Sequence, residues 1–480
     1  MIMQSGGSLS VRFYLAFACL FILTSSFLSP LSHLSGVARA DDSAPQELEA
    51  FQGYLDPAPH GMDIRYAWTL PGGHGENVRI VDIEYNWNLN HNDLVHITSD
   101  LFIFVKGVNP LPEQVLNEGN KNHGTAVLGE LAAAPDGVGV TGIAYGAKLG
   151  LINPLTQGSV PDVAGAINRA ASIVGPGDVI LLEQQSFAGP RLDLQVGRGL
   201  LPIEYEPEVF AAIKAATNKG IIVVESAGNG FENLDHPAYG GLFDRKRRDS
   251  GAIIVGAGLP EGGVYGPGPD LTRTEESNYG SCVDVQGWGR FVATTGYGDL
   301  RREQGENNWY TDLFGATSGA TAMVAGAAVV LQSIIKERGL APLSPTVLRR
   351  LLIMTGTQQT IGLGERIGPR PNIRAAIAAL DGDVSVLEPR ITEIKFKKSG
   401  GKLIVDGENF LPGDSVIEID GQATARFKYP SGYVLSNGTT TRIMTKGDVS
   451  EMIPRGVEVS ITVFTPATGK RSEAFSYRRN

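Results

Sequence analysis

Short, continuously apolar segments alternate with alanine-rich segments over most of the chain, from about Tyr54 to Leu380. The clearest apolar segments are rich in β-branched residues and cover residues 78–81, 179–182, 221–224 and 253–255. The alanine-rich segments have helical character and cover residues 125–134, 163–171 and 209–218. A strand that is buried on both faces is apolar at every position, so this alternation predicts an α/β fold with a doubly wound, mostly parallel sheet flanked by helices.

The longest predicted helix begins near Ser318 and ends at about Arg338, just before Gly339. Its apolar side chains recur at helical spacing on one face: Val324, Ala328, Leu331 and Ile335. A second helix is predicted over residues 344–355, because Ser-Pro supplies a capping side chain and then a residue suited to the first turn.

The pattern changes after Asp383. Short strands with alternating apolar and polar positions follow, the clearest at residues 403–406, 416–419 and 457–463. Asp420-Gly421 and Asn437-Gly438 are typical turns between them, and no helical pattern occurs. We therefore expect a small antiparallel β-sandwich over residues 390–480, joined by a linker (383–389) to the α/β domain (54–382).

The N-terminal region has the pattern of a secretory signal peptide. Arg12 precedes an apolar run over residues 13–28, and Ala38-Arg39-Ala40 places small residues where a signal peptidase cuts. We predict a signal peptide over residues 1–40 with cleavage after Ala40, and hence a secreted or periplasmic protein. An uncleaved anchor is the alternative, although the run is short for a full membrane span. Residues 41–53 lack hydrophobic periodicity and are predicted to be a disordered leader.

Charge and cysteine content narrow the function classes. The formal net charge is −10, which argues against nucleic acid and, after signal cleavage, against a membrane surface as partners. Only two cysteines occur, and Cys19 lies in the signal peptide, so no intramolecular disulfide is expected after cleavage. Cys282 is expected to lie in a strand as a small buried apolar residue.

Three residues stand where an α/β sheet could bring catalytic groups together. Asp82 ends an apolar strand, His123 opens an alanine-rich helix, and Ser318 opens the long helix. Each signal alone is weak, since such residues often serve only as caps. Together they supply a hydroxyl nucleophile, an imidazole base and a carboxylate that orients the imidazole. The combination predicts nucleophilic acyl transfer at the carboxyl ends of the strands.

The flanks of these residues resemble the subtilisin family of serine peptidases. Four blocks carry the likeness in the family's order: Val81-Asp82 with residues 91–94, then residues 123–129, 223–229 and 316–327. The resemblance covers about residues 54–380. It implies a secreted serine-type endopeptidase that acts on proteins or peptides.

The resemblance also assigns roles. Ser318 would attack the scissile carbonyl, and His123 would act as general base and then as general acid. Asp82 would orient His123, while the Asn229 amide and the Ser318 backbone N–H would hold the oxyanion. Since a histidine base must be neutral to work, a neutral-to-alkaline enzyme is expected.

Several positions depart from the family pattern. Ala322 replaces a proline of the serine block, and Gly319 and Met323 replace its usual Met and His. These changes leave the pose of Ser318 less defined by the resemblance, but they remove no member of the triad.

The specificity residues follow less directly from the resemblance. Glu84 lies two residues after Asp82, on the same strand face, and would either favour basic substrate groups at the cleft edge or be a solvated rim acid. Glu225 is a candidate for a specificity pocket that prefers Lys or Arg. Gly228, beside Asn229, is a candidate substrate-binding residue.

The last two expectations concern cofactors and the function of the C-terminal domain. No metal or other cofactor is assigned; structural calcium is common in the family, but the acidic residues here follow no ion-binding loop pattern. The C-terminal region resembles immunoglobulin-like IPT/TIG domains through Pro389–Ile394, residues 403–410 and 472–477. This likeness implies binding of another protein or a polysaccharide.

Two other functions remain open at this point. One is a binding protein that keeps a subtilisin fold but has lost its chemistry, which the altered serine block would explain. The other is an esterase or transpeptidase that uses the same acyl-enzyme, since only the final nucleophile differs.

Overall fold

The computed structural model describes most of the chain downstream of the expected signal peptide. The described residues are 47–106, 118–156, 160–187, 199–262, 268–381, 389–397, 399–410, 415–424, 427–428, 440–465 and 470–479. The signal peptide, the cleavage point after Ala40 and residues 383–388 of the linker lie outside these ranges and stay predictions.

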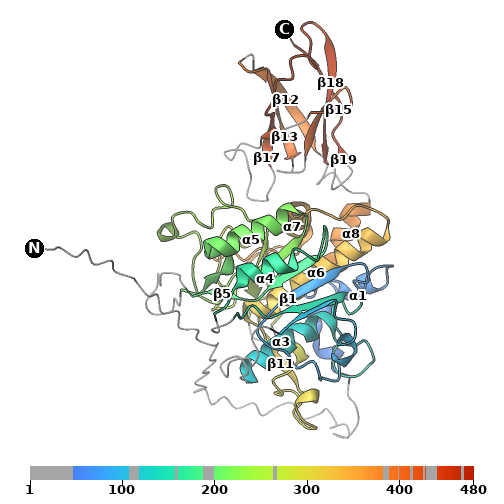
Figure 1. Ribbon diagram of the computed structural model, residues 1–480, viewed down its shortest axis with the longest axis vertical. Coiled ribbons are helices and arrows are strands. Elements are labelled where there is room, and N and C mark those ends of the chain that lie inside the picture. Colours follow the sequence, from blue (N-terminus) through green and yellow to red (C-terminus); the bar gives the residue numbers. More distant parts are fainter. Residues whose placement is uncertain are drawn as a thin grey trace, which may run out of the picture.

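A seven-stranded parallel sheet forms the centre of the larger unit (Figure 1), in the order β2-β3-β1-β4-β7-β8-β9. The strands are β1 (Arg79–Ile83), β2 (Ile103–Val105), β3 (Lys148–Ile152), β4 (Val179–Leu182), β7 (Ile222–Ser226), β8 (Ile253–Gly258) and β9 (Val285–Trp288). Every neighbouring pair in the sheet is parallel. The predicted fold class is therefore confirmed.

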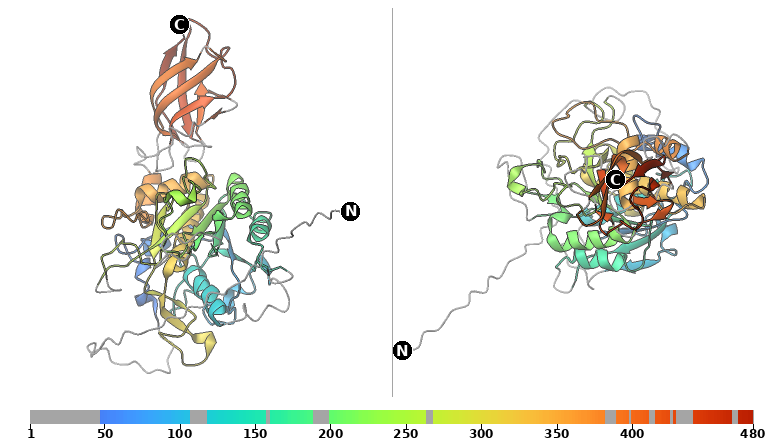
Figure 2. Two further views of the ribbon diagram at one scale, coloured as in Figure 1. Left: turned by 90° about the vertical axis from the view of Figure 1, so that its left-hand side faces the viewer. Right: turned by 90° about the horizontal axis from the view of Figure 1, so that it is seen from above.

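Helices cover both faces of this sheet, as two views show (Figure 1, Figure 2). One face packs against α4 (Val163–Ala170) and α5 (Pro207–Asn218), and the other against α3 (Glu118–Ala132) and α6 (Ala316–Glu337). Side chains of β1 alternate between the two cores: Ile80 joins the core that contains α3 and α6, whereas Val81 joins that of α4 and α5. Complete burial on both sides explains why the strands are apolar throughout.

Helix α6 runs through the core. By length and composition it is the one helix in the described part of the chain that could cross a membrane, and its most apolar window is wholly buried inside the protein. It is followed by α7 (Pro345–Thr355) and α8 (Ile373–Asp381). The Val347 N–H donates to the Ser344 hydroxyl, which is the cap that the sequence predicts for α7.

Smaller elements connect these parts. Helix α1 spans Ile64–Trp68, and two short antiparallel pairs join β5 (Gln185–Ser186) to β6 (Leu201–Pro202) and β10 (Val292–Thr295) to β11 (Tyr310–Phe314). The 3₁₀ helices are η1 (Glu49–Phe51), η2 (Gly53–Leu55), η3 (Val95–Ile97), η4 (Ile203–Tyr205), η5 (Pro237–Tyr239) and η6 (Glu306–Asn308).

Residues 47–53, expected to belong to the disordered leader, are part of the folded unit. The fully buried Gln52 side chain donates to the Thr141 carbonyl and accepts from the Thr141 N–H, both at 2.8 Å. Leu48 packs in a small core with Val140 and Tyr310. This corrects the expected boundary at 53, because contacts made far along the chain fix a segment that has no periodicity of its own.

The C-terminal unit consists of two antiparallel sheets around a core of its own (Figure 2). One sheet holds β12 (Arg390–Lys397), β13 (Lys402–Phe410), β16 (Phe427–Lys428) and β17 (Thr440–Thr445). The other holds β14 (Val416–Ile419), β15 (Gln422–Ala423), β18 (Glu458–Thr465), β19 (Lys470–Arg471) and β20 (Phe475–Arg478). Antiparallel sheets were predicted here; the likeness to IPT/TIG domains stays a prediction.

Candidate active site

The carboxyl end of β1 is the natural binding position of this sheet. β1 lies between β3 and β4, and the chain reaches β3 on one side before it crosses to β4 on the other. Open α/β sheets bind their ligands where the strand order reverses in this way. Asp82 and Glu84 stand at this end, and the Glu84 N–H is tied to the Ile152 carbonyl at 3.2 Å.

His123 and Ser318 meet beside this strand end. The His123 Nε2 atom lies 2.9 Å from the Ser318 Oγ atom, although 195 positions separate the two residues. His123 comes from α3 and Ser318 from the first turn of α6, two helices of the same core. Ser318 is 7% exposed, and the His123 side chain is 24% exposed. An imidazole at this distance can take the hydroxyl proton.

The carboxylate that contacts His123 is Glu84. Its Oε2 atom lies 2.7 Å from His123 Nδ1, and its Oε1 atom accepts a hydrogen bond from the Tyr85 N–H at 2.6 Å. The Glu84 side chain is only 4% exposed. A carboxylate at Nδ1 holds the imidazole proton on that nitrogen and leaves Nε2 free to accept one from serine. Glu84 is therefore neither a solvated rim acid nor placed to receive a basic substrate group.

Asp82, expected to orient His123, makes a different contact. Its Oδ2 atom accepts a hydrogen bond from the Trp87 indole N–H at 2.7 Å, and its Oδ1 atom has no hydrogen-bond partner among the described residues. Burial, and then the charge of Glu84, raise the pKa of Asp82 to about 8. The expectation is thus corrected, because the indole takes up this carboxyl while the longer glutamate, beyond the strand end, reaches the imidazole.

The pKa of His123 reflects this neighbour. Burial acts to lower it, but the charge of Glu84 and the hydrogen bond with Glu84 outweigh burial, with a smaller contribution from Asp82. The pKa of His123 is therefore raised above its usual 6.5. The imidazolium that forms when His123 takes a proton is stabilised mainly by Glu84.

Gly124 gives Glu84 its space. A Cβ atom at this position would overlap the Asn86 carbonyl oxygen and lie 2.9 Å from both Glu84 Cγ and Trp87 Cδ1. Only a residue without a side chain lets α3 approach the end of β1 so closely. The close packing of α3 against the end of β1 therefore explains why a glycine follows His123.

The first turn of α6 leaves the Ser318 N–H outside the helix's own hydrogen bonds. Intrahelical bonding begins at Gly319, whose N–H donates to the Gly315 carbonyl at 3.0 Å. The Ala316 N–H donates to Gly289 at 2.8 Å. A helix start with such a backbone donor favours a developing negative charge.

Asn229 is held beside this helix start with a defined side-chain orientation. Its Oδ1 atom accepts from the Thr317 N–H at 3.1 Å and from the Thr317 hydroxyl at 2.8 Å. Its backbone N–H donates to the Gln185 side chain at 2.9 Å. No hydrogen bond of the Nδ2 group is found among the described residues, so Asn229 offers a second donor beside the helix start that carries Ser318.

Gly228 and Glu225, the tentative substrate-binding residues, have other surroundings. Gly228 is buried with φ +88°, and its N–H donates to the Ser226 hydroxyl at 3.2 Å, so it shapes the turn before Asn229. Ser226 bonds to Thr317 on the site side of β7 at 2.5 Å. Strand alternation therefore turns Glu225 to the opposite face, where it is fully buried and accepts from the Glu204 N–H at 3.2 Å. This corrects its expected place in a specificity pocket.

Two further carboxyls near the site were not singled out from the sequence. Glu183 directly follows β4 and Glu130 lies on α3, and both are buried. Burial raises the pKa of each well above its usual range; for Glu183 the charges of Glu84, Asp82 and Glu130 add to this, and Ser318 partly opposes it. An acid at the end of a wholly apolar strand, in Leu181-Leu182-Glu183, was the available signal.

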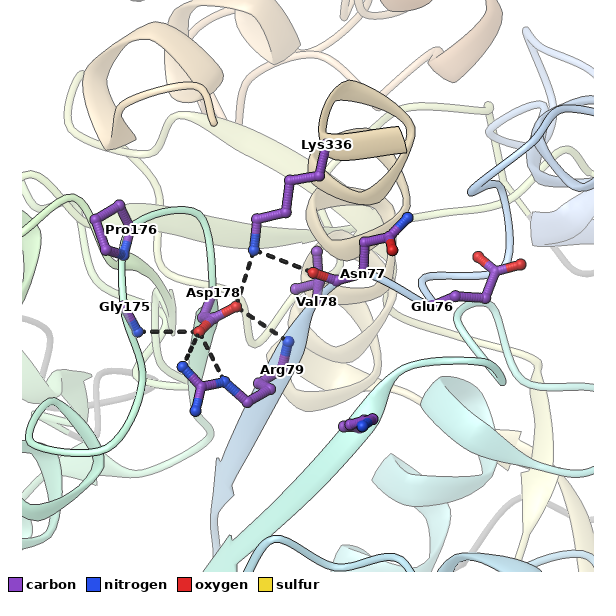
Figure 3. Close-up of a pocket in the computed structure, with 9 residues that line it drawn as sticks. Glu76, Asn77, Val78, Arg79, Gly175, Pro176, Asp178 and Lys336 are labelled. Carbon is purple, nitrogen blue, oxygen red and sulfur yellow. Dashed lines mark hydrogen bonds and ion pairs between the residues drawn. The ribbon is translucent and has the colours of Figure 1, made fainter. Parts of the chain in front are cut away.

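A cleft of about 460 Å³ lies at the other end of the strands, at the amino-terminal end of β1 (Figure 3). There Asp178 accepts hydrogen bonds from the Arg79 guanidinium, the Lys336 ammonium and the Gly175 N–H. Asp178, Arg79 and Lys336 are thus tied to one another, at the end of the sheet that lies away from Ser318. Within the described ranges, no group of three His, Cys, Asp or Glu side chains is arranged to hold a metal ion.

A parallel α/β sheet with a serine, a histidine and a carboxylate linked at its carboxyl edge has the arrangement of serine hydrolases. Residues 103–368, more than half of the chain, match the Subtilase family (Peptidase_S8). The chain belongs to this family. The matched range begins after β1, so Asp82 and Glu84 both lie outside it.

The chain is similar in sequence to several known proteases. The chain is 26% identical to the extracellular basic protease of Dichelobacter nodosus, over 58% of this chain and 43% of that protein. It is 26% identical to Subtilisin Savinase of Lederbergia lenta, over 47% of this chain and 68% of the relative. Among solved structures, the prenylagaramide maturation protease PagA is 17% identical with a TM-score of 0.46, over 66% of this chain and 97% of that one. The chain thus matches less than half the length of the first of these relatives.

Proposed function

We propose that this protein is a serine endopeptidase that cleaves proteins or peptides through an acyl-enzyme on Ser318. The observation that carries the proposal is the 2.9 Å contact between Ser318 Oγ and His123 Nε2 at the carboxyl edge of the sheet. Membership of the subtilase family and the protease names of its relatives support the same activity.

The proposed reaction has two halves. In the first, Ser318 Oγ attacks the scissile carbonyl carbon while its proton passes to His123 Nε2, and the oxyanion accepts hydrogen bonds from the Ser318 N–H and Asn229 Nδ2. His123 then gives that proton to the leaving amine, the C–N bond breaks, and the acyl group stays on Oγ. In the second half, water attacks the acyl carbon, its proton passes through His123 to Oγ, and the carboxylic acid leaves.

Export is a second part of the proposal. The predicted signal peptide with a cut after Ala40, and relatives such as the extracellular basic protease, support secretion or periplasmic location. The C-terminal sandwich would then serve to bind another protein or a polysaccharide. Sequencing the N-terminus of the exported protein tests the first point: Asp41 is the expected first residue unless trimming follows, and an intact Met1 would contradict cleavage.

Incubation with a peptide library, followed by mass analysis of the products, tests the activity. The wild type is expected to release peptides with new termini, and Ser318→Ala should cost on the order of 10⁶ in turnover. Ligated products would indicate transpeptidation, and cleavage of esters without peptides would indicate an esterase. Equal peptide cleavage by wild type and Ser318→Ala would overturn the proposal, and so would no cleavage by either.

A further inference from the structure

The carboxylate that contacts His123 is the point at which the structure departs from the assignment made from the sequence. We infer that Glu84, and not Asp82, is the residue that positions His123 for its reaction with Ser318. The inference rests on the proposed peptidase function and moves the third triad member two residues along the chain, past the end of β1.

The geometry around Glu84 meets the requirements of that role. One oxygen faces His123 Nδ1 at 2.7 Å, and the other is held by the Tyr85 N–H at 2.6 Å, so the carboxylate cannot turn without losing a hydrogen bond. The residue's own N–H is fixed to the Ile152 carbonyl of β3. The group is also nearly excluded from water, which strengthens its interaction with a protonated imidazole.

Asp82 lacks these features. Its hydrogen bond goes to Trp87, and the second oxygen has no partner in the described part of the chain. Burial, and then the charge of Glu84 close by, raise the pKa of Asp82 to about 8. A mostly neutral carboxyl is a weak partner for an imidazolium.

Asp82 has a structural task instead. By accepting from the Trp87 indole it holds that ring against Gly124, where Trp87 Cδ1 lies within 2.9 Å of the position that a Cβ would take. The ring thus closes the space between the end of β1 and α3. Asp82 supports the wall of the site, and Glu84 faces the histidine.

Isosteric amide substitutions separate the two acids. Glu84→Gln keeps the shape but offers an uncharged group to Nδ1, and we expect kcat to fall by about 10⁴-fold with KM little changed, as for the amide replacement in other triads. Asp82→Asn keeps the acceptor for Trp87, and we expect a loss of less than about tenfold. Thermal unfolding of both variants serves as the folding control. A large loss in Asp82→Asn with near-normal activity in Glu84→Gln would overturn the inference.

Titration of the His123 ring by NMR provides a measurement that does not depend on turnover. Removing the charge of Glu84 should lower the pKa of His123 in Glu84→Gln, with a smaller change in Asp82→Asn. If Glu84→Gln fails to fold, Glu84→Asp, shorter by one methylene, keeps the charge but withdraws it and should lower the pKa in the same direction. A His123 pKa that responds to Asp82→Asn and not to the Glu84 variants would contradict the inference. A protein that cleaves nothing but shows the expected titration would contradict only the peptidase proposal.

Discussion

The side-chain oxygen of Asn229 accepts two hydrogen bonds from Thr317, one from its backbone N–H at 3.1 Å and one from its hydroxyl at 2.8 Å. Because a backbone N–H can only donate, these bonds fix which end of the amide faces Thr317. The Nδ2 donor is left beside the residue that follows, Ser318. The turn after β7 and the start of α6 are thereby joined by two hydrogen bonds.

Replacing Asn229 tests whether this donor serves the reaction. Asn229→Ala removes Nδ2, and we expect kcat to fall by about 10²–10³-fold with little change in KM, because the oxyanion exists only after attack. Steady-state kinetics on a peptide substrate measures both constants. Thr317→Val is the matched control: it removes the hydroxyl contacts with Asn229 and Ser226 but keeps the backbone N–H bond to Asn229, and its loss should be clearly smaller. A change confined to KM in Asn229→Ala would contradict the assigned role.

The pH dependence of activity follows from His123. Its pKa is raised above 6.5, mainly by Glu84 against the effect of burial, and only the neutral imidazole can accept the serine proton. We therefore expect kcat/KM to fall as the pH drops through a value above 6.5. In Glu84→Gln the same limb should move to lower pH. An acid limb well below 6.5 in the wild type would contradict this account.

Gly124→Ala is expected to disturb the site through packing alone. The added Cβ would overlap the Asn86 carbonyl and press on Glu84 Cγ, so Glu84 must move away from His123. We expect a loss of stability of about 1–3 kcal/mol and a drop in kcat of at least about tenfold. Gly175→Ala is the control, since a Cβ there meets no atom within 4 Å. Equal behaviour of the two variants in urea unfolding and turnover assays would show that the close approach does not matter.

Asp178 offers a stability test remote from the site. It binds Arg79, Lys336 and two backbone N–H groups, and these contacts outweigh burial and lower its pKa. Asp178→Asn should lower the free energy of unfolding by about 1–3 kcal/mol at neutral pH, less than for a wholly buried ion pair, because Arg79 is partly exposed. The stabilisation from a lowered carboxyl pKa is complete above the unfolded value of about 4 and is lost as the pH falls through the folded value, so the difference should shrink in acid. Urea unfolding at pH 7 and pH 3 measures this; a difference that grows in acid would be inconsistent with it.

Much of the fold follows from local pattern. The strand at residues 179–182 was predicted with its observed bounds, and β1, β7 and β8 were predicted to within a few residues, because wholly buried strands are apolar at every position. The strands β2 and β3 were not predicted. Two predictions about where elements begin were wrong, one for the helix that carries His123 and one for the strand near Cys282. His123 lies inside α3, which already includes Glu118, and Cys282 lies in a turn before β9, although it is buried as predicted.

The choice between Asp82 and Glu84 lies beyond what the sequence pattern can decide. Both acids share one strand face, and the outcome depends on where the Trp87 indole points and on the space that Gly124 leaves. The prediction that Glu225 lies in a specificity pocket was wrong for a related reason. Its neighbour Ser226 bonds to Thr317 of α6, far along the chain, and the Glu225 side chain therefore points to the other face of the sheet. Such contacts become visible only once the elements are packed.

The most direct test of the central claim is covalent labelling of Ser318 by a fluorophosphonate probe, read by mass spectrometry of the digested protein. The hydroxyl 2.9 Å from His123 Nε2 should react, so one adduct is expected on the peptide that contains Ser318 in the wild type and none at that position in Ser318→Ala. An unlabelled wild type, or the same labelling in both proteins, would contradict the account.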